Sequence, residues 1–260
     1  MCGETEEVSP ETGVAGWLRF FMAMDRSAMM ESEGILMCGR FTFILDDYHV
    51  LIVRYGLTKI PFEIVPRYNV APSQLVAAII SDGEQNRIGQ LKWGLVPSWA
   101  KAESFGYKTI NAKAETVDTK PAFREAFKRR RCIIPADSFY EWRKEGNSKQ
   151  PMRIVPQDGG LFSLAGLWDS WTAPDGRKVN SCTIITTIPN ELMAGIHNRM
   201  PVILERDAET TWLDRSAQDG ATLKELMRPY PAEELRAYPV SAKVGNVRND
   251  GPELIEEVAI

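Results

Sequence analysis

Short apolar and β-branched runs, separated by Gly, Pro and Asp turn signals, fill the chain from residue 37 onward. Runs of this length predict many short strands rather than long helices. The predicted strands cover residues 41–45, 75–81, 87–93, 132–134, 139–143, 152–155, 161–168, 181–187 and 238–241. Asp82-Gly83 is a turn signal, which joins the second and third of these strands into a hairpin.

A few helical segments interrupt the strands. Residues 46–55 predict a helix that ends at Gly56, and residues 120–131 predict another with Phe123 and Phe127 on one face. Two further helices are expected at 210–213 and 221–227. Strands and helices that do not alternate strictly predict one α+β domain rather than a doubly wound fold.

The first 36 residues differ from this pattern. They contain seven acidic and two basic residues and lack a clear strand or a capped helix. We therefore predict that residues 1–36 are a mis-called or disordered N-terminal extension and that residues 37–260 form the domain. The remainder holds 31 − 2 = 29 bases and 35 − 7 = 28 acids. This balance argues against a polybasic coat and leaves room for a local basic groove.

Composition narrows the class of protein. A hydrophobic content of 44% and a charged content of 25% are typical of globular domains. The apolar runs are much shorter than the roughly 20 residues that cross a bilayer, so we expect no membrane association. Four cysteines without CxxC spacing and two histidines predict no metal site, and sparse cysteine favours the reducing cytoplasm.

Met37-Cys38-Gly39 begins the dense pattern and resembles a translation start. Removal of Met37 would make Cys38 the terminal residue. The alternative is that Met37-Cys38 is interior and Cys38 is a small core residue. Cys2 also follows a methionine, but Glu4, Glu6 and Glu7 surround it with negative charge, and we interpret it as a decoy.

A terminal cysteine carries an amine and a thiol on adjacent carbons. Both can attack one aldehyde carbon and close a five-membered thiazolidine. The α-amine has a pKa of about 7.7–8.0, so a useful fraction is neutral at cellular pH. The same terminus could instead serve an N-terminal-nucleophile hydrolase, in which the amine is the base for the thiol.

Five motifs follow in order along the chain. They are Met37–Thr42, Arg67–Ser73, Lys92–Trp99 with Asn111–Thr116, Pro135–Trp142, and Ile196–Pro201. Together they resemble the SRAP (SOS response-associated peptidase) family of abasic-site processing proteins. The resemblance extends from Met37 to about Glu253.

The resemblance implies a single α+β domain with a mixed, barrel-like sheet core flanked by helices. It implies covalent capture of abasic sites in single-stranded DNA, with lyase activity and a self-processing peptidase activity as additions. Four residues match the catalytic positions of the family: Cys38, Asn111, Glu141 and His197. Four match its DNA contacts: Arg40, Trp93, Lys113 (where relatives often carry arginine) and Arg199.

The implied chemistry suits these residue types. The Cys38 amine and thiol would capture the aldehyde, while Glu141 and His197 would move protons. Asn111 would hold the amine or a sugar hydroxyl. The expected partner is single-stranded DNA, and no cofactor or metal is required. We expect a monomer in the bacterial cytoplasm that joins the nucleoid when bound to DNA.

Simpler interpretations stay open for single residues. Outside the family, Glu141 would be an outward strand residue, His197 a structural histidine and Asn111 a turn residue. Trp93 and Trp99 would be core aromatics, although a base can stack on an exposed ring. Residues 128–131 would be a solvated helix face.

Three other residues carry no functional expectation. His49 is expected on a helix surface, and Cys132 and Cys182 are expected to be buried strand thiols. Two other function classes also remain. One is a glutamine amidohydrolase that uses Cys38, and the other is a single-stranded-DNA-binding module in which the cysteine is incidental.

Overall fold

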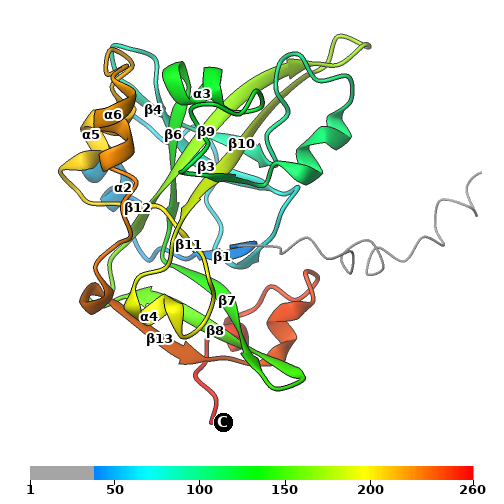
Figure 1. Ribbon diagram of the computed structural model, residues 1–260, viewed down its shortest axis with the longest axis vertical. Coiled ribbons are helices and arrows are strands. Elements are labelled where there is room, and N and C mark those ends of the chain that lie inside the picture. The colour runs from blue at the N-terminus through cyan, green and yellow to red at the C-terminus, as the bar shows by residue number, and fades with distance from the viewer. Residues whose placement is uncertain (1–37, 260) are drawn as a thin grey trace, which may run out of the picture. The chain divides into compact units, whose positions relative to one another are not determined.

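The structure is a computed structural model that describes residues 38–259. Most of its regular elements are strands, arranged in two sheets (Figure 1). The strands are β1 (Arg40–Phe43), β2 (Arg67–Val70), β3 (Leu75–Ser81), β4 (Asn86–Trp93), β5 (Asn111–Lys113), β6 (Arg131–Ala136), β7 (Ser138–Glu145), β8 (Ser148–Pro156), β9 (Phe162–Thr172), β10 (Lys178–Thr187), β11 (Met200–Pro201), β12 (Ile203–Leu204) and β13 (Leu235–Pro239). The α-helices are α2 (His49–Tyr55), α3 (Arg124–Arg129), α4 (Glu191–Ala194), α5 (Ala208–Leu213) and α6 (Gly220–Glu225).

Five strands of the larger sheet close into a small barrel. Its order is β10-β4-β3-β6-β9, and β9 pairs with β10 to complete the ring. The β10–β4 pair is parallel and the others are antiparallel, so the barrel is mixed. The far half of β10 carries two short strands, β5 in parallel and β11 in antiparallel orientation. The end of β10 thus becomes a platform beside the barrel.

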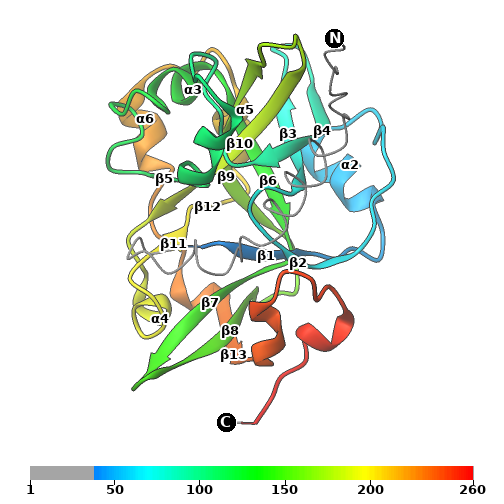
Figure 2. The ribbon, with the colours of Figure 1, turned by 90° about the vertical axis from the view of Figure 1, so that its right-hand side faces the viewer.

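The second sheet has the order β13-β8-β7-β1-β2 and lies at one end of the barrel (Figure 2). Its central antiparallel pair places Phe41 of β1 opposite Phe139 of β7. The chain passes from the barrel strand β6 into β7 across a single residue, Asp137. This residue ties the two sheets, because its carboxylate accepts hydrogen bonds from Thr42 Oγ1 (2.8 Å) and the Ile44 N–H (2.7 Å).

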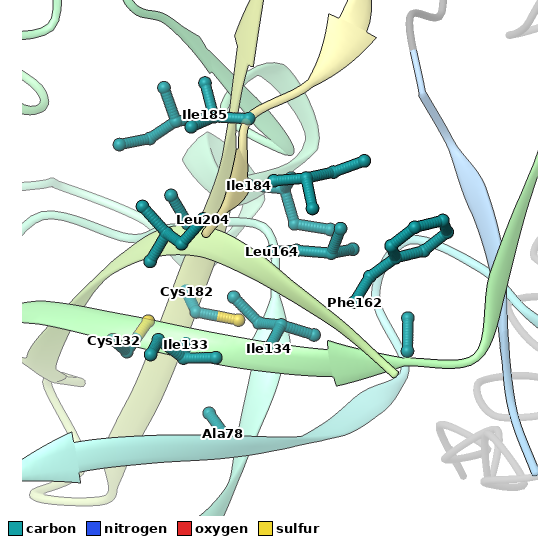
Figure 3. Close-up of a cluster of buried hydrophobic side chains, with 14 of the residues drawn as sticks. Ala78, Cys132, Ile133, Ile134, Phe162, Leu164, Cys182, Ile184, Ile185 and Leu204 are labelled. Carbon is teal, nitrogen blue, oxygen red and sulfur yellow. The ribbon is translucent and has the colours of Figure 1, made fainter. Parts of the chain in front are cut away.

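The barrel interior is apolar and tightly packed. Ile133, Ile134, Leu164, Cys132 and Cys182 are at most 1% exposed and belong to one cluster (Figure 3). Gly166 on β9 is required by this packing. A Cβ at position 166 would clash with the Ile134 side chain and lie 2.9 Å from Cys132 Sγ. The barrel is therefore a solid core, and it supports the neighbouring elements.

The structure confirms the predicted fold class, an α+β domain with a mixed, barrel-like core. Gly56 ends α2 as predicted, with φ of 61°. The predicted helix 120–131 is much shorter. Arg130 leaves the helical conformation with φ −134° and ψ 58°, and Arg131 already belongs to β6. Strands β2 and β5 were not predicted.

Two further expectations concern the limits of the domain and the membrane. The predicted extension 1–36 lies outside the described residues, so the boundary at residue 37 stays a prediction. Within residues 38–259, no helix is long and apolar enough to cross a membrane.

Candidate active site

Cys38 and Glu141 meet at the start of the second sheet. The antiparallel register places Arg40 of β1 opposite Tyr140 of β7. Gly39, the residue before β1, therefore lies alongside Glu141, and Cys38 comes directly before Gly39. The Cys38 main-chain N–H donates a hydrogen bond to Glu141 Oε1 over 2.6 Å. Both residues are buried, with 4% and 1% exposure. The main-chain nitrogen of Cys38 is thus held directly against a carboxylate.

Burial controls the protonation of this pair. Burial and the neighbouring Glu141 carboxylate raise the pKa of the Cys38 thiol well above its ordinary value, and Arg199 opposes them. Burial also raises the pKa of Glu141, while His197 and the hydrogen bonds from Cys38 pull it down. The thiol is therefore neutral, and Glu141 can hold a proton at higher pH than an exposed glutamate.

His197 approaches Glu141 from the loop between α4 and β11. Its Nδ1 lies 4.0 Å from Glu141 Oε2, beyond hydrogen-bond distance, so the two groups interact electrostatically. The Arg199 N–H donates to His197 Nδ1 over 3.2 Å. The same Nδ1 lies 3.3 Å from the Arg199 carbonyl, so the ring contacts both main-chain groups of Arg199. The loop is fixed upstream, where the His197 N–H bonds the Met193 carbonyl at 2.7 Å.

The platform at the end of β10 gathers the remaining polar residues. Asn111 lies opposite Ile184, and its Nδ2 donates to the Ile184 carbonyl at 3.4 Å. Lys113 lies opposite Thr186 and is exposed. Arg199 arrives on the other side of β10, where its Nη2 donates to the Thr186 carbonyl at 2.6 Å. Lys113 and Arg199 therefore flank the same strand residue.

Arg199 also holds an acid that the sequence analysis gave no role. Its Nη1 and Nη2 donate to the two carboxylate oxygens of Glu115, at 2.5 and 3.0 Å. Glu115 follows β5 closely, so the strand that presents Lys113 also presents this carboxylate. The motif Asn111–Thr116 contained Glu115, but only the fold shows that it faces Arg199.

Two predicted DNA contacts are buried. Trp93 is 1% exposed; its ring packs on Phe41 at 5.2 Å, and its Nε1 donates to the Ile110 carbonyl at 2.9 Å. In this DNA-free structure the Trp93 ring thus packs in the core and presents no free face. Its neighbour Trp99 is 57% exposed and offers such a face instead.

Arg40 is 6% exposed, and its guanidinium donates to protein acceptors. Nη1 bonds Asn69 Oδ1 at 3.0 Å and the Val244 carbonyl at 2.6 Å, and Nη2 bonds the Gly245 carbonyl at 3.2 Å. Arg40 therefore clamps the C-terminal segment to β1 in this DNA-free structure.

The structure thus brings together Cys38, Glu141, His197 and Arg199, and places Asn111 and Lys113 on the adjoining platform. Among residues 38–259, no cluster of three or more acidic, cysteine or histidine ligands is arranged to hold a metal ion. A buried main-chain nitrogen, a carboxyl with raised pKa, an imidazole and nearby cations suit proton transfer beside an anionic substrate.

Comparisons with known proteins identify the family of this chain. The family model for SOS response associated peptidase (SRAP) matches residues 37–247. The chain belongs to the SRAP family.

Its relatives include the abasic site processing protein YoqW of Bacillus subtilis, 49% identical over 85% of this chain and 99% of the relative. The abasic site processing protein YedK of Escherichia coli is 33% identical over 85% of this chain and its own full length. A solved structure from Bacteroides thetaiotaomicron is 31% identical, covers 74% of this chain and 85% of its own, and superposes with a TM-score of 0.68.

Proposed function

We propose that this protein processes abasic sites in single-stranded DNA by forming a covalent bond through Cys38. Membership of the SRAP family and the names of the relatives support abasic-site processing. The observation that carries the chemistry is the 2.6 Å contact between the Cys38 nitrogen and Glu141 Oε1. An amine at that position has a proton acceptor in place.

The working chain begins at Cys38 in this proposal, after removal of Met37. A peptide nitrogen is not nucleophilic, so only a terminal Cys38 can react through nitrogen. The family match begins at residue 37, which supports this start. The backbone adds support, because Cys38 has φ of 46°. That left-handed conformation costs an internal cysteine about 1–2 kcal/mol, whereas the first residue of a chain has no φ angle to constrain.

The reaction balances without an oxidant or cofactor. The neutral Cys38 amine adds to the C1′ aldehyde of the ring-opened sugar, and loss of one water gives an imine. The thiol then adds across the C=N bond: sulfur bonds to C1′ and the thiol proton moves to nitrogen. The product is a thiazolidine. The raised pKa of the thiol favours this order, in which the amine attacks first.

Neighbouring groups manage the protons. Glu141 takes the proton that the amine loses and returns it when water leaves, and its raised pKa makes the protonated form easier to reach. His197 presents Nε2–H to a sugar oxygen, and Asn111 holds a sugar hydroxyl or the amine. Lys113 and Arg199 form ion pairs with phosphates of the DNA backbone, and Trp99 stacks on a base.

Two side activities follow from the same groups. The imine makes the sugar C2′ proton acidic, and its loss would expel the 3′ phosphate by β-elimination, which is a lyase reaction. The peptidase activity in the family's name would be cleavage before Cys38 in a longer chain. We further propose that the protein acts as a monomer in the cytoplasm, where its DNA substrate lies.

A denaturing gel tests the proposal. Three purified forms would be mixed with an abasic single-stranded oligonucleotide: the 260-residue chain, a chain initiated at Met37, and that shorter chain with Cys38→Ala. We expect a shifted band from the Met37 form and none from the Cys38→Ala form. A shifted band from the 260-residue chain would indicate cleavage before Cys38, which the mass of its N-terminus would verify.

The gel also separates the competing functions. No shifted band from any folded form would contradict the cross-linking proposal. Release of ammonia from glutamine would then favour an amidohydrolase that uses Cys38. Retained DNA binding without a covalent product would favour a binding module.

A further inference from the structure

The cation nearest the proposed reaction centre is already paired with an acid. Arg199 meets both carboxylate oxygens of Glu115, at 2.5 and 3.0 Å. The arginine side chain is 10% exposed, whereas that of Glu115 is 46% exposed. The acid therefore lies on the solvent side of the pair and covers the cation.

The remaining donors of Arg199 are also committed or enclosed. Nη2 additionally bonds the Thr186 carbonyl, and Nε is buried without a hydrogen-bond partner among residues 38–259. The Nη1–Nη2 edge of the guanidinium, which binds Glu115, is therefore the edge that faces solvent. A second anion can form a bidentate contact with Arg199 only where Glu115 now lies.

Glu115 lies between the two cations that the proposed function assigns to DNA. Its pKa is lowered by its hydrogen bonds to Arg199, with a smaller contribution from the charge of Lys113. It is therefore ionised at neutral pH, and it reduces the charge of the group Lys113, Glu115 and Arg199 from +2 to +1. A carboxylate and a phosphate both accept two parallel N–H bonds from arginine, so each can replace the other.

We propose that Glu115 is a phosphate-mimicking latch on Arg199: its carboxylate occupies, in the DNA-free protein, the place that a DNA phosphate takes in the complex. The proposal rests on the proposed function for the identity of the incoming anion. Glu115 then sets the affinity of the DNA site, because every productive complex must displace it. Weak, non-specific contacts with undamaged strands are suppressed by this competition.

The test measures non-covalent binding with a probe that cannot react. A fluorescent single-stranded oligonucleotide with a tetrahydrofuran abasic analogue has no aldehyde, and fluorescence anisotropy follows its binding over a series of salt concentrations. We expect Glu115→Gln to bind about 3- to 10-fold more tightly at low salt, because one more cation is free to pair with phosphate. The plot of log K against log salt should steepen by about 0.7, the value for one additional contact with single-stranded DNA.

A matched control and a double variant isolate the mechanism. Glu257 pairs with Arg236 at 2.8 Å on the surface, with both side chains more than half exposed. Glu257→Gln removes the same charge, and its affinity should stay within about 2-fold of wild type because no cation of the site is released. With Arg199→Gln present, Glu115→Gln should lose most of its gain.

The outcomes distinguish this proposal from the proposed function. Equal or weaker binding by Glu115→Gln, or no measurable binding by either form, overturns the latch. An equal gain from Glu257→Gln also overturns it, since the effect would then be one of net charge. The gel with a natural abasic oligonucleotide is independent: if the wild type cross-links but Glu115→Gln gains no affinity, only the latch fails.

Discussion

The three described cysteines occupy two contrasting regions of the molecule. Cys132 and Cys182 lie in the apolar interior of the barrel, whereas Cys38 lies at the start of β1 against Glu141 (Figure 3 shows the first two). Burial raises the pKa of all three thiols. Burial alone therefore cannot mark a reactive cysteine. The difference lies in the neighbours, because only Cys38 has a carboxylate on its main-chain nitrogen and an imidazole just beyond it.

This contrast also indicates which nucleophile acts first. A neutral, buried thiol is a poor nucleophile in either region. At Cys38 the main-chain nitrogen donates a 2.6 Å hydrogen bond to Glu141. The proposed reaction therefore requires a free amine at Cys38, and the sulfur acts only after the imine has formed.

The largest effect is expected from Cys38→Ser in the chain initiated at Met37. A terminal serine keeps the amine but has no thiol to close the thiazolidine, so the heat-stable band should disappear. Borohydride should still trap an imine, because the amine and Glu141 remain. A heat-stable band of normal intensity from Cys38→Ser would contradict the role of the sulfur.

Glu141→Gln should slow cross-linking by about 10²-fold, the lower end of the range for lost acid–base assistance. The matched control is Glu145→Gln on the same strand, since Glu145 pairs with Arg143 away from Cys38. The rate of band formation under excess DNA measures both variants. Similar rates for Glu141→Gln and wild type would remove Glu141 from the mechanism.

Cys132→Ala and Cys182→Ala should leave the cross-linking rate unchanged. Each removes a fully buried sulfur, so the free energy of unfolding should fall by about 1 kcal/mol, the scale for a small cavity. Denaturant midpoints give the stability and the gel gives the rate. Loss of cross-linking by a folded Cys132→Ala protein would show that a barrel thiol contributes to the reaction as well as to the packing of the core.

The smallest effect concerns pH and stability. The pKa of Glu141 is raised in the folded protein, so folding favours its protonated form. The stabilisation that this proton provides is present below the unfolded pKa of about 4.3 and is lost as pH rises through the folded pKa. Glu141→Gln lacks this titration. The wild type should therefore lose stability relative to Glu141→Gln as pH rises above about 4, and denaturant curves over a series of pH values would measure the difference. A constant difference would contradict the raised pKa.

Much of the fold could be predicted because its strands are locally encoded. β3 has the predicted bounds 75–81, and the hairpin to β4 follows from Asp82-Gly83. β5 could not be predicted in this way. Its three residues are too few for a periodic pattern, and its partner β10 lies about seventy residues away in the sequence. β2 has only four residues and lies close to Pro72, so it too lacks a clear strand pattern.

The site residues also divide into those that the sequence pattern could predict and those that depend on contacts between distant parts of the chain. Motif order singled out Cys38, Glu141, His197 and Arg199, which the structure brings together. The order of the motifs could not tell a buried side chain from an exposed one. Arg40 and Trp93 are enclosed by Val244 and Phe41 respectively, and such contacts form only in the folded chain. Glu115 was missed for the same reason, since its partner Arg199 is distant in the sequence.

The mass of the cross-linked product shows whether the amine and the thiol of Cys38 have both reacted. The chain initiated at Met37 would be joined to an abasic oligonucleotide, treated with borohydride and weighed intact, and its peptides would then be mapped. We predict the sum of the two masses minus one water, unchanged by borohydride, with the modification on Cys38 as the terminal residue. A product that gains two hydrogens on reduction, or a modification on a lysine, would contradict the claim that the amine and thiol of Cys38 capture one carbon.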